Sequence, residues 1–127
     1  MIENLHDEVI RQIVGHLNQR DYDVYTNPGQ QKNAGIGDNY PDVVMTVKNE
    51  QTVKFILEIE TADSVTETEA SQQWRKYANE IKASFYIVVP SNSVSRAKQY
   101  CVKYGVNARF ASYSVSSNDT ITFNFNV

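Results

Sequence analysis

Two acidic residues lie inside stretches of this chain that otherwise have the composition of buried β-strands. Asp42 follows Pro41 and opens the stretch Asp-Val-Val-Met-Thr-Val, and Glu58 lies in Phe-Ile-Leu-Glu-Ile-Glu, two residues before Glu60. An ionised carboxylate in such a place is costly unless a cation or strong hydrogen bonds hold it. Carboxylates on neighbouring strands form the oxygen-rich cage that a divalent metal ion prefers. We therefore expect a metal site here.

The two acidic stretches are predicted to pair as a β-hairpin. A turn at residues 48–51 joins a strand over 42–47 to a strand over 52–61. In the simplest register, the acid of the first strand lies across from the two glutamates of the second. Those glutamates share one strand face and lie about 6.6 Å apart along it.

A second interpretation of the same residues needs no metal. Asp42 would cap a turn after Pro41, and Glu58 and Glu60 would lie on the solvated face of an edge strand. Ile56 lies on that face too, which argues against full solvation.

The remaining periodicity predicts alternating helices and strands. Helices are expected over 4–19, 67–82 and 93–104, with a cap at Asn4, a capping box of Thr66 and Glu69, and an end at Gly105. Strands are expected over 21–26, 85–89, 109–115 and 120–125, and a polar, glycine-rich loop over 27–39. The order α-β-β-β-α-β-α-β-β predicts one α/β domain over residues 1–127. Its mixed central sheet is flanked by helices and ends in a C-terminal β-hairpin.

Composition bears on the compartment and the partners. The 127 residues contain no apolar run long enough to span a membrane and no basic-then-apolar leader. We expect a soluble, cytoplasmic protein without a membrane partner, and a core position for its single cysteine, Cys101. The net charge of −3 is unfavourable for binding nucleic acid. Part of that charge is the predicted site, which a metal ion would neutralise.

The motifs and their order resemble the PD-(D/E)XK nuclease superfamily, whose restriction-endonuclease-like fold has an αβββαβ core. Pro41-Asp42 matches the PD motif, and Glu58-Ile59-Glu60 falls where (D/E)-X-K is expected. Residues 22–44 are similar to archaeal Holliday-junction resolvases. The segment Gln73 to Tyr77 is similar to the Q-x-x-x-Y element of RecB-type nucleases. The likeness covers roughly residues 4–90.

The resemblance implies a Mg²⁺- or Mn²⁺-dependent nuclease that acts on DNA. Asp42, Glu58 and the backbone carbonyl of Ile59 would hold the metal ion. Glu60 would orient or deprotonate the attacking water, and Gln73 would reach a metal-bound water or a phosphate. A homodimer is expected, because so small a domain contacts little of a duplex.

Three residues with roles in the family also have ordinary alternatives, and they are Glu8, Gln73 and Tyr77. Glu8 would be an accessory metal ligand from the first helix, or only a favourable partner of the helix dipole. Tyr77 would pack beneath the site, or be ordinary core with Gln73 as an exposed polar neighbour. His6 falls on the apolar helix face, where we expect a satisfied or partly exposed histidine, and Trp74 is expected to anchor its helix in the core.

One departure from the family pattern affects catalysis. Glu60 stands where the family has lysine. Lys54 shares the strand face of Glu60 but is distant, and Lys76 is the better candidate for a migrated positive charge. Lys32 and the loop glycines would approach a DNA backbone, or they form only a flexible surface loop. Two other functions therefore stay open. One is a catalytically inactive member of the fold that binds nucleic acid or assembles with proteins, and the other is an unrelated α/β interaction domain.

Overall fold

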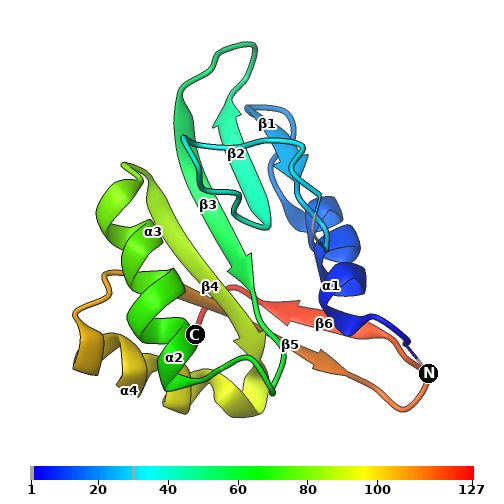
Figure 1. Cartoon of the computed structure of the whole chain (residues 1–127). Coiled ribbons are helices and arrows are strands. Elements are labelled where there is room, and N and C mark those ends of the chain that lie inside the picture. Colours follow the sequence, from blue (N-terminus) through cyan, green and yellow to red (C-terminus); the bar gives the residue numbers. More distant parts are fainter. Residues whose placement is uncertain (1, 30) are drawn as a thin grey trace.

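The computed structural model describes residues 2–29 and 31–127, so Met1 and Gln30 lie outside the described residues. The predicted order of helices and strands is confirmed (Figure 1). The elements are α1 (Leu5–Ile13), η1 (Val14–His16), β1 (Tyr22–Thr26), β2 (Val43–Val47), β3 (Val53–Ile59), α2 (Glu67–Glu69), η2 (Ala70–Trp74), α3 (Arg75–Glu80), β4 (Ser84–Pro90), η3 (Ser91–Ser93), α4 (Val94–Tyr104), β5 (Arg109–Val115) and β6 (Ile121–Asn124).

The strands form one mixed sheet of six, in the order β1-β2-β3-β4-β5-β6. The first three strands are antiparallel neighbours, β4 and β5 each run parallel to the strand before them, and β6 returns antiparallel to β5. Each parallel step is bridged by helix, first by the segment from α2 to α3 and then by α4, as parallel pairing requires. The chain therefore has the predicted α/β class, with a mixed sheet, flanking helices and a C-terminal hairpin.

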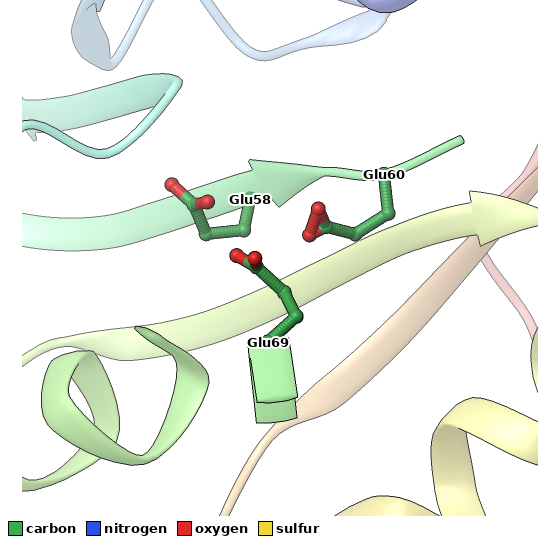
Figure 2. A group of neighbouring side chains, drawn as sticks. All are labelled: Glu58, Glu60 and Glu69. Carbon is green, nitrogen blue, oxygen red and sulfur yellow. The ribbon is translucent and has the colours of Figure 1, made fainter. Parts of the chain in front are cut away.

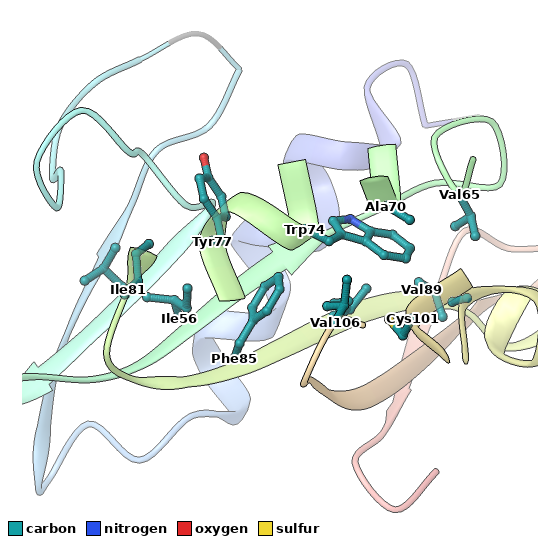
Figure 3. Close-up of a cluster of buried hydrophobic side chains, with 13 residues drawn as sticks. Ile56, Val65, Ala70, Trp74, Tyr77, Ile81, Phe85, Val89, Cys101 and Val106 are labelled. Atoms are coloured by element: carbon teal, nitrogen blue, oxygen red, sulfur yellow. The ribbon is translucent and has the colours of Figure 1, made fainter. Parts of the chain in front are cut away.

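Alternating side chains of the sheet build one hydrophobic layer on each face. On one face, residues of β3 and β4 pack against the segment from α2 to α3 and against α4, with Trp74 and Cys101 in the layer as expected (Figure 3). On the other face the layer includes Val9, Ile10, Ile13, Val43, Leu57, Ile59 and Val88, which bring α1 against the sheet. Burial on both faces explains why β4 reads as a nearly continuous apolar run.

Helix α1 begins where predicted but ends sooner. The Asn4 side chain caps it by accepting the Asp7 amide N–H at 3.1 Å. The predicted helix over 4–19 is too long, because a 3₁₀ turn follows Ile13 and Leu17 is already extended. Gly15 lies in that turn, and glycine loses more conformational freedom on ordering than any other residue.

The helical segment from Glu67 to Glu80 changes its hydrogen bonding in the middle. The Arg75 amide N–H reaches the carbonyl of Ala70, five residues earlier, so η2 is a π-helical turn. Such turns are often found at functional sites. The segment ends two residues before the predicted end because Ile81 is extended.

The predicted loop over residues 27–39 has no helix or strand in its described part beyond an isolated bridge between Ile36 and Asn39. Gln30 of this loop is outside the described residues.

Helix α4 ends at Gly105 as predicted. Gly105 has the left-handed conformation (φ 65°) that glycine adopts without strain.

Candidate metal centre

Strands β2 and β3 part at one end of their ladder, and this parting creates the site. The hydrogen bonding of β2 with β1 and of β3 with β4 continues past the point where β2 and β3 part. The Asn27 amide N–H donates to the Asp42 carbonyl at 3.0 Å, and the Glu60 amide N–H donates to the Val88 carbonyl at 2.8 Å. Between the two strands, however, side chains replace the backbone pairing.

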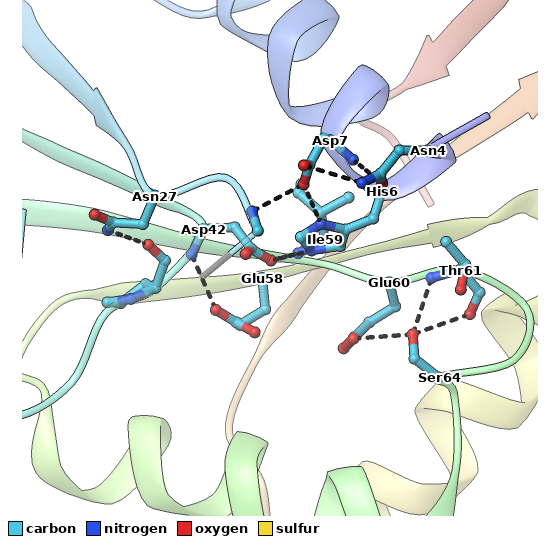
Figure 4. Close-up of polar contacts among 12 residues, drawn as sticks. Asn4, His6, Asp7, Asn27, Asp42, Glu58, Ile59, Glu60, Thr61 and Ser64 are labelled. Carbon is cyan, nitrogen blue, oxygen red and sulfur yellow. Dashed lines mark hydrogen bonds and ion pairs between the residues drawn. The ribbon is translucent and has the colours of Figure 1, made fainter. Parts of the chain in front are cut away.

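Asp42 and Glu58 hold the parted strands together. The Asp42 amide N–H donates to Glu58 Oε1 at 3.1 Å, and the Ile59 amide N–H donates to Asp42 Oδ2 at 2.8 Å (Figure 4). Asp42 is 8% exposed and Glu58 is 6% exposed. The predicted juxtaposition of these two acids across the hairpin is confirmed, since the ladder pairs Val43 with Leu57 directly beside them.

Glu60 continues the β3 face just beyond the strand. It is 4% exposed, its Oε2 accepts the Trp74 indole N–H at 3.1 Å, and its Oε1 accepts the Ser64 hydroxyl at 3.1 Å. Trp74 therefore anchors the core and orients a carboxylate of the site. The interpretation of Glu58 and Glu60 as a solvated edge is wrong, because β3 is a central strand and both are buried.

Glu69 brings a further carboxylate from the first turn of the helical segment. One oxygen from each of Glu58, Glu60 and Glu69 lies within 4.8 Å of the others. Figure 2 shows Glu69 rising from the helix toward the two glutamates of the strand. The predicted capping box is only half present: the Thr66 hydroxyl accepts the Glu69 amide N–H at 3.2 Å, while the Glu69 carboxylate faces the site.

The π-helical turn explains how three residues of one helical segment reach the same site. Glu69 joins the acidic cluster, Gln73 lines the adjacent cavity, and Trp74 bonds Glu60. Gln73 and Trp74 follow Glu69 by four and five residues. All three reach the site because hydrogen bonds between residues five apart put more residues into each helical turn than an α-helix has.

His6 approaches the site from α1. Its Nε2 lies 3.1 Å from Asp42 Oδ2, and its Nδ1 lies 2.9 Å from Asp7 Oδ1 (Figure 4). A ring held between two carboxylates donates from both nitrogens when it is protonated. His6 thus supplies a cation beside Asp42, which its predicted place on the apolar helix face did not indicate.

The three glutamates of the site retain protons unusually strongly. Burial raises the pKa of Glu58 well above its usual range, and the charges of Asp42 and Glu60 raise it further. Burial and then the charge of Glu69 raise the pKa of Glu60 to about 8. Burial raises the pKa of Glu69 as well. The hydrogen bond with Asp42 raises the pKa of His6 to about 9 despite the opposing effect of burial.

These groups line an open, polar cavity of about 550 Å³. Of the predicted site residues, it brings together Asp42, Glu58, Ile59, Glu60 and Gln73. Sequence reasoning missed four groups that contribute to the centre, and they are His6, Asp7, Ser64 and Glu69.

Other predicted residues are not brought to the centre. The carboxylate of Glu8 bonds to the side chains of Arg11 and Gln12 and does not line the cavity. Lys54 and Lys76 are exposed and also lie outside it, whereas Lys32 lines it. Tyr77 lies in the core layer, and Glu58 contributes to the raised pKa of its hydroxyl, after burial.

The donor set is suited to a hard divalent cation. Asp42, Glu58, Glu60 and Glu69 present only oxygen atoms, which Mg²⁺ and Mn²⁺ prefer. Buried carboxylates that repel one another are relieved when a cation displaces their protons.

No family model, curated protein or solved structure matches this chain. None of the helices in the described part of the chain has the length and apolar composition of a membrane-spanning segment.

Proposed function

We propose that this chain is a Mg²⁺- or Mn²⁺-dependent nuclease that hydrolyses phosphodiester bonds in DNA. The observation that carries the proposal is the convergence of Asp42, Glu58, Glu60 and Glu69 at the parted ends of β2 and β3, beside an open polar cavity. An acidic cavity of this kind repels a phosphodiester until a cation neutralises it. The proposed activity therefore depends on the metal ion for substrate entry as well as for chemistry.

The restriction-endonuclease-like fold is part of the same proposal. Three antiparallel strands follow α1, and β4 pairs parallel to β3 after a helical crossover. This is the αβββαβ order of the PD-(D/E)XK resemblance. Asp42 just before β2 and Glu58 near the end of β3 would correspond to the acids of that motif.

Asp42, Glu58 and the Ile59 carbonyl would hold the metal ion, and Glu69 is a ligand candidate that the resemblance did not include. A bound Mg²⁺ supplies a more acidic water and stabilises the charge that develops on the phosphate. Glu60 would accept the proton of the attacking water, with its orientation fixed by Trp74.

Gln73 would donate its side-chain amide to a phosphate oxygen or to a metal-bound water, since it lines the same cavity. We include a homodimer in the proposal, because a chain of 127 residues covers only a short stretch of duplex DNA. The dimer would present two such cavities to the substrate.

DNA cleavage tests this proposal. Single-stranded, duplex and branched DNA are incubated with the protein and Mn²⁺, and products are resolved on a denaturing gel. Cleavage is expected with the wild type and with Glu50→Gln, whose side chain is exposed and outside the cavity. Cleavage should be lost in Glu58→Gln. Products that are equally abundant with Glu58→Gln would contradict the proposal.

A second candidate is a catalytically inactive member of the same fold that binds nucleic acid or assembles with proteins. Glu60 favours it, because this residue stands at the lysine position and its carboxylate is engaged by Trp74 and Ser64. Binding of DNA by the wild type with no cleavage under any metal condition would support this candidate.

A further inference from the structure

We propose that Lys32 binds a phosphate group of the substrate at the mouth of the cavity. The inference rests on the proposed nuclease function and names the residue that recognises the anionic backbone of DNA. The positive charge would then come from the loop between β1 and β2, not from β3, where Glu60 stands instead of lysine.

The loop that carries Lys32 is folded around the side chain of Asn27, which is 2% exposed. The Asn27 amide group donates to the carbonyls of Ala34 and Pro41, both at 2.7 Å. Its side-chain oxygen accepts the amide N–H groups of Asn33 and Ala34, both at 2.8 Å. All four hydrogen-bonding positions of the side chain are therefore used, which gives the loop a specific shape.

Asp7 fastens the same loop to the metal centre. Its Oδ1 accepts the Gly29 amide N–H at 2.9 Å and also lies 2.9 Å from Nδ1 of His6. The other nitrogen of His6 contacts Asp42. A continuous series of hydrogen bonds thus connects the loop to an acid of the site.

Tyr40 directs the Lys32 side chain. A Cβ atom on Gly35 would lie 2.6 Å from Tyr40 Cε1, so the ring packs directly against the glycine backbone. The Lys32 ammonium group lies over this ring, 5.3 Å from its centroid. Both Lys32 and Tyr40 line the cavity that contains the acids. A cation–π contact of this kind is attractive, which favours this orientation.

The ammonium group of Lys32 is available to an anion. Within the described part of the chain it forms no ion pair with a carboxylate. Lys32 is also the only lysine or arginine among the described residues that line the cavity. Among the residues that the structure describes, Lys32 Nζ has no hydrogen-bond partner, so its N–H donors can reach phosphate oxygens while its charge lies over the Tyr40 ring.

The test compares DNA binding by Lys32→Met, Lys32→Arg and Lys76→Met. Fluorescence anisotropy of a fluorescein-labelled duplex is measured with Ca²⁺ in the buffer, and a gel confirms that the DNA stays intact. Lys76→Met is the matched control, since Lys76 is exposed and outside the cavity.

Lys32→Met should weaken binding about tenfold, the effect of losing one charge-assisted hydrogen bond. The slope of log affinity against log salt should also decrease in magnitude by about 1, which a merely structural residue would not cause. Lys32→Arg should retain most of the affinity, and Lys76→Met all of it. Calorimetry should show that Lys32→Met binds Mn²⁺ like the wild type.

Three results would overturn the proposal: a wild type that does not bind DNA, a Lys32→Met affinity within twofold of wild type, or equal losses in the Lys32 and Lys76 variants. A different result would show that only the nuclease proposal fails. DNA binding would then still depend on Lys32, but the wild type would cleave no substrate with Mg²⁺ or Mn²⁺.

Discussion

The indole N–H of Trp74 donates to the Glu60 carboxylate at 3.1 Å, which joins the hydrophobic core to the acidic centre. Trp74 is fully buried between the sheet and the helical segment (Figure 3). Its ring position is set by apolar packing, so its N–H donor is held in place without help from the site. A buried carboxylate that accepts such a bond keeps one orientation.

Replacing Trp74 with Phe should weaken metal binding through Glu60. The indole hydrogen bond lowers the pKa of Glu60 against the effect of burial, so its loss should raise that pKa further. At pH 7 the variant then holds the Glu60 proton more strongly. Calorimetry should show weaker Mn²⁺ binding at pH 7, with most of the difference regained at pH 9. A reduction in Mn²⁺ affinity that is equal at pH 7 and at pH 9 would contradict this role of Trp74.

Metal binding by the wild type should release protons at neutral pH. Glu60, with a pKa of about 8, is largely protonated there in the metal-free protein, and burial also raises the pKa of Glu58 well above its usual range. A bound cation drives protons off the carboxylates that hold it or lie beside it, so the apparent affinity for Mn²⁺ should increase as pH rises from 6 to 8. Titrations of Mn²⁺ in buffers of different ionisation enthalpy measure the number of protons released. A value near zero at pH 7 would contradict a metal ion bound by Glu58 beside Glu60.

The metal-free protein should lose stability as pH rises, and Glu60→Gln should reduce that loss. Folding raises the pKa of Glu60 from an ordinary value of 4.5 to about 8. Its stabilising contribution is therefore complete below pH 4.5 and is lost as pH rises toward and through 8. His6 behaves in the same direction between 6.5 and about 9.

At pH 8, Glu60→Gln should stabilise the metal-free fold by an amount on the order of a few kcal/mol, because the neutral amide avoids a buried charge. Urea unfolding at pH 5 and pH 8 measures this difference. Added Mn²⁺ should increase the free energy of unfolding less for Glu60→Gln than for the wild type. Equal stability of the two proteins at both pH values would show that Glu60 carries no such penalty.

The raised pKa of His6 should depend on Asp42. The hydrogen bond with Asp42 is the largest cause of the shift to about 9. In Asp42→Asn, we expect the pKa of His6 to fall toward 6.5, and in Asp7→Asn to fall less. Nuclear magnetic resonance of the imidazole ring follows this titration, in a His16→Gln background that leaves one histidine among the described residues. An unchanged His6 pKa in Asp42→Asn would mean that the two side chains do not interact in solution.

The order of elements could be predicted because it follows from local periodicity. The hairpin also predicted that Asp42 lies across from the Glu58 end, but the register shifts by one residue between Met45 and Thr46, and this shift sets Asp42 opposite Glu58. An irregularity of this kind is not visible in the alternation of side chains. Helix boundaries were less accurate. The early end of α1 depends on Gly15 and on packing that the apolar spacing does not reveal.

The rest of the centre depends on contacts between distant segments. Glu69 fitted a capping box, and that local role concealed a carboxylate aimed at β3. Its spacing of four residues from Gln73 was a signal that the two could act together. The π-helical turn is a change in a single set of backbone bonds, which has no periodic signature. Lys32 reaches the cavity only because Asn27 folds the loop, and loop shape was not predictable from composition.

The most direct test of the central claim is a calorimetric titration of Mn²⁺ into wild type, Asp42→Asn and Glu58→Gln. Asp63→Asn and Glu50→Gln are matched controls, since both residues are exposed and outside the cavity. The wild type and the controls should bind Mn²⁺ alike, and the two site variants should bind more weakly by a factor of about ten or more. Site variants that bind as tightly as the wild type, or a wild type that binds no metal ion, would contradict the claim that these acids form a metal centre.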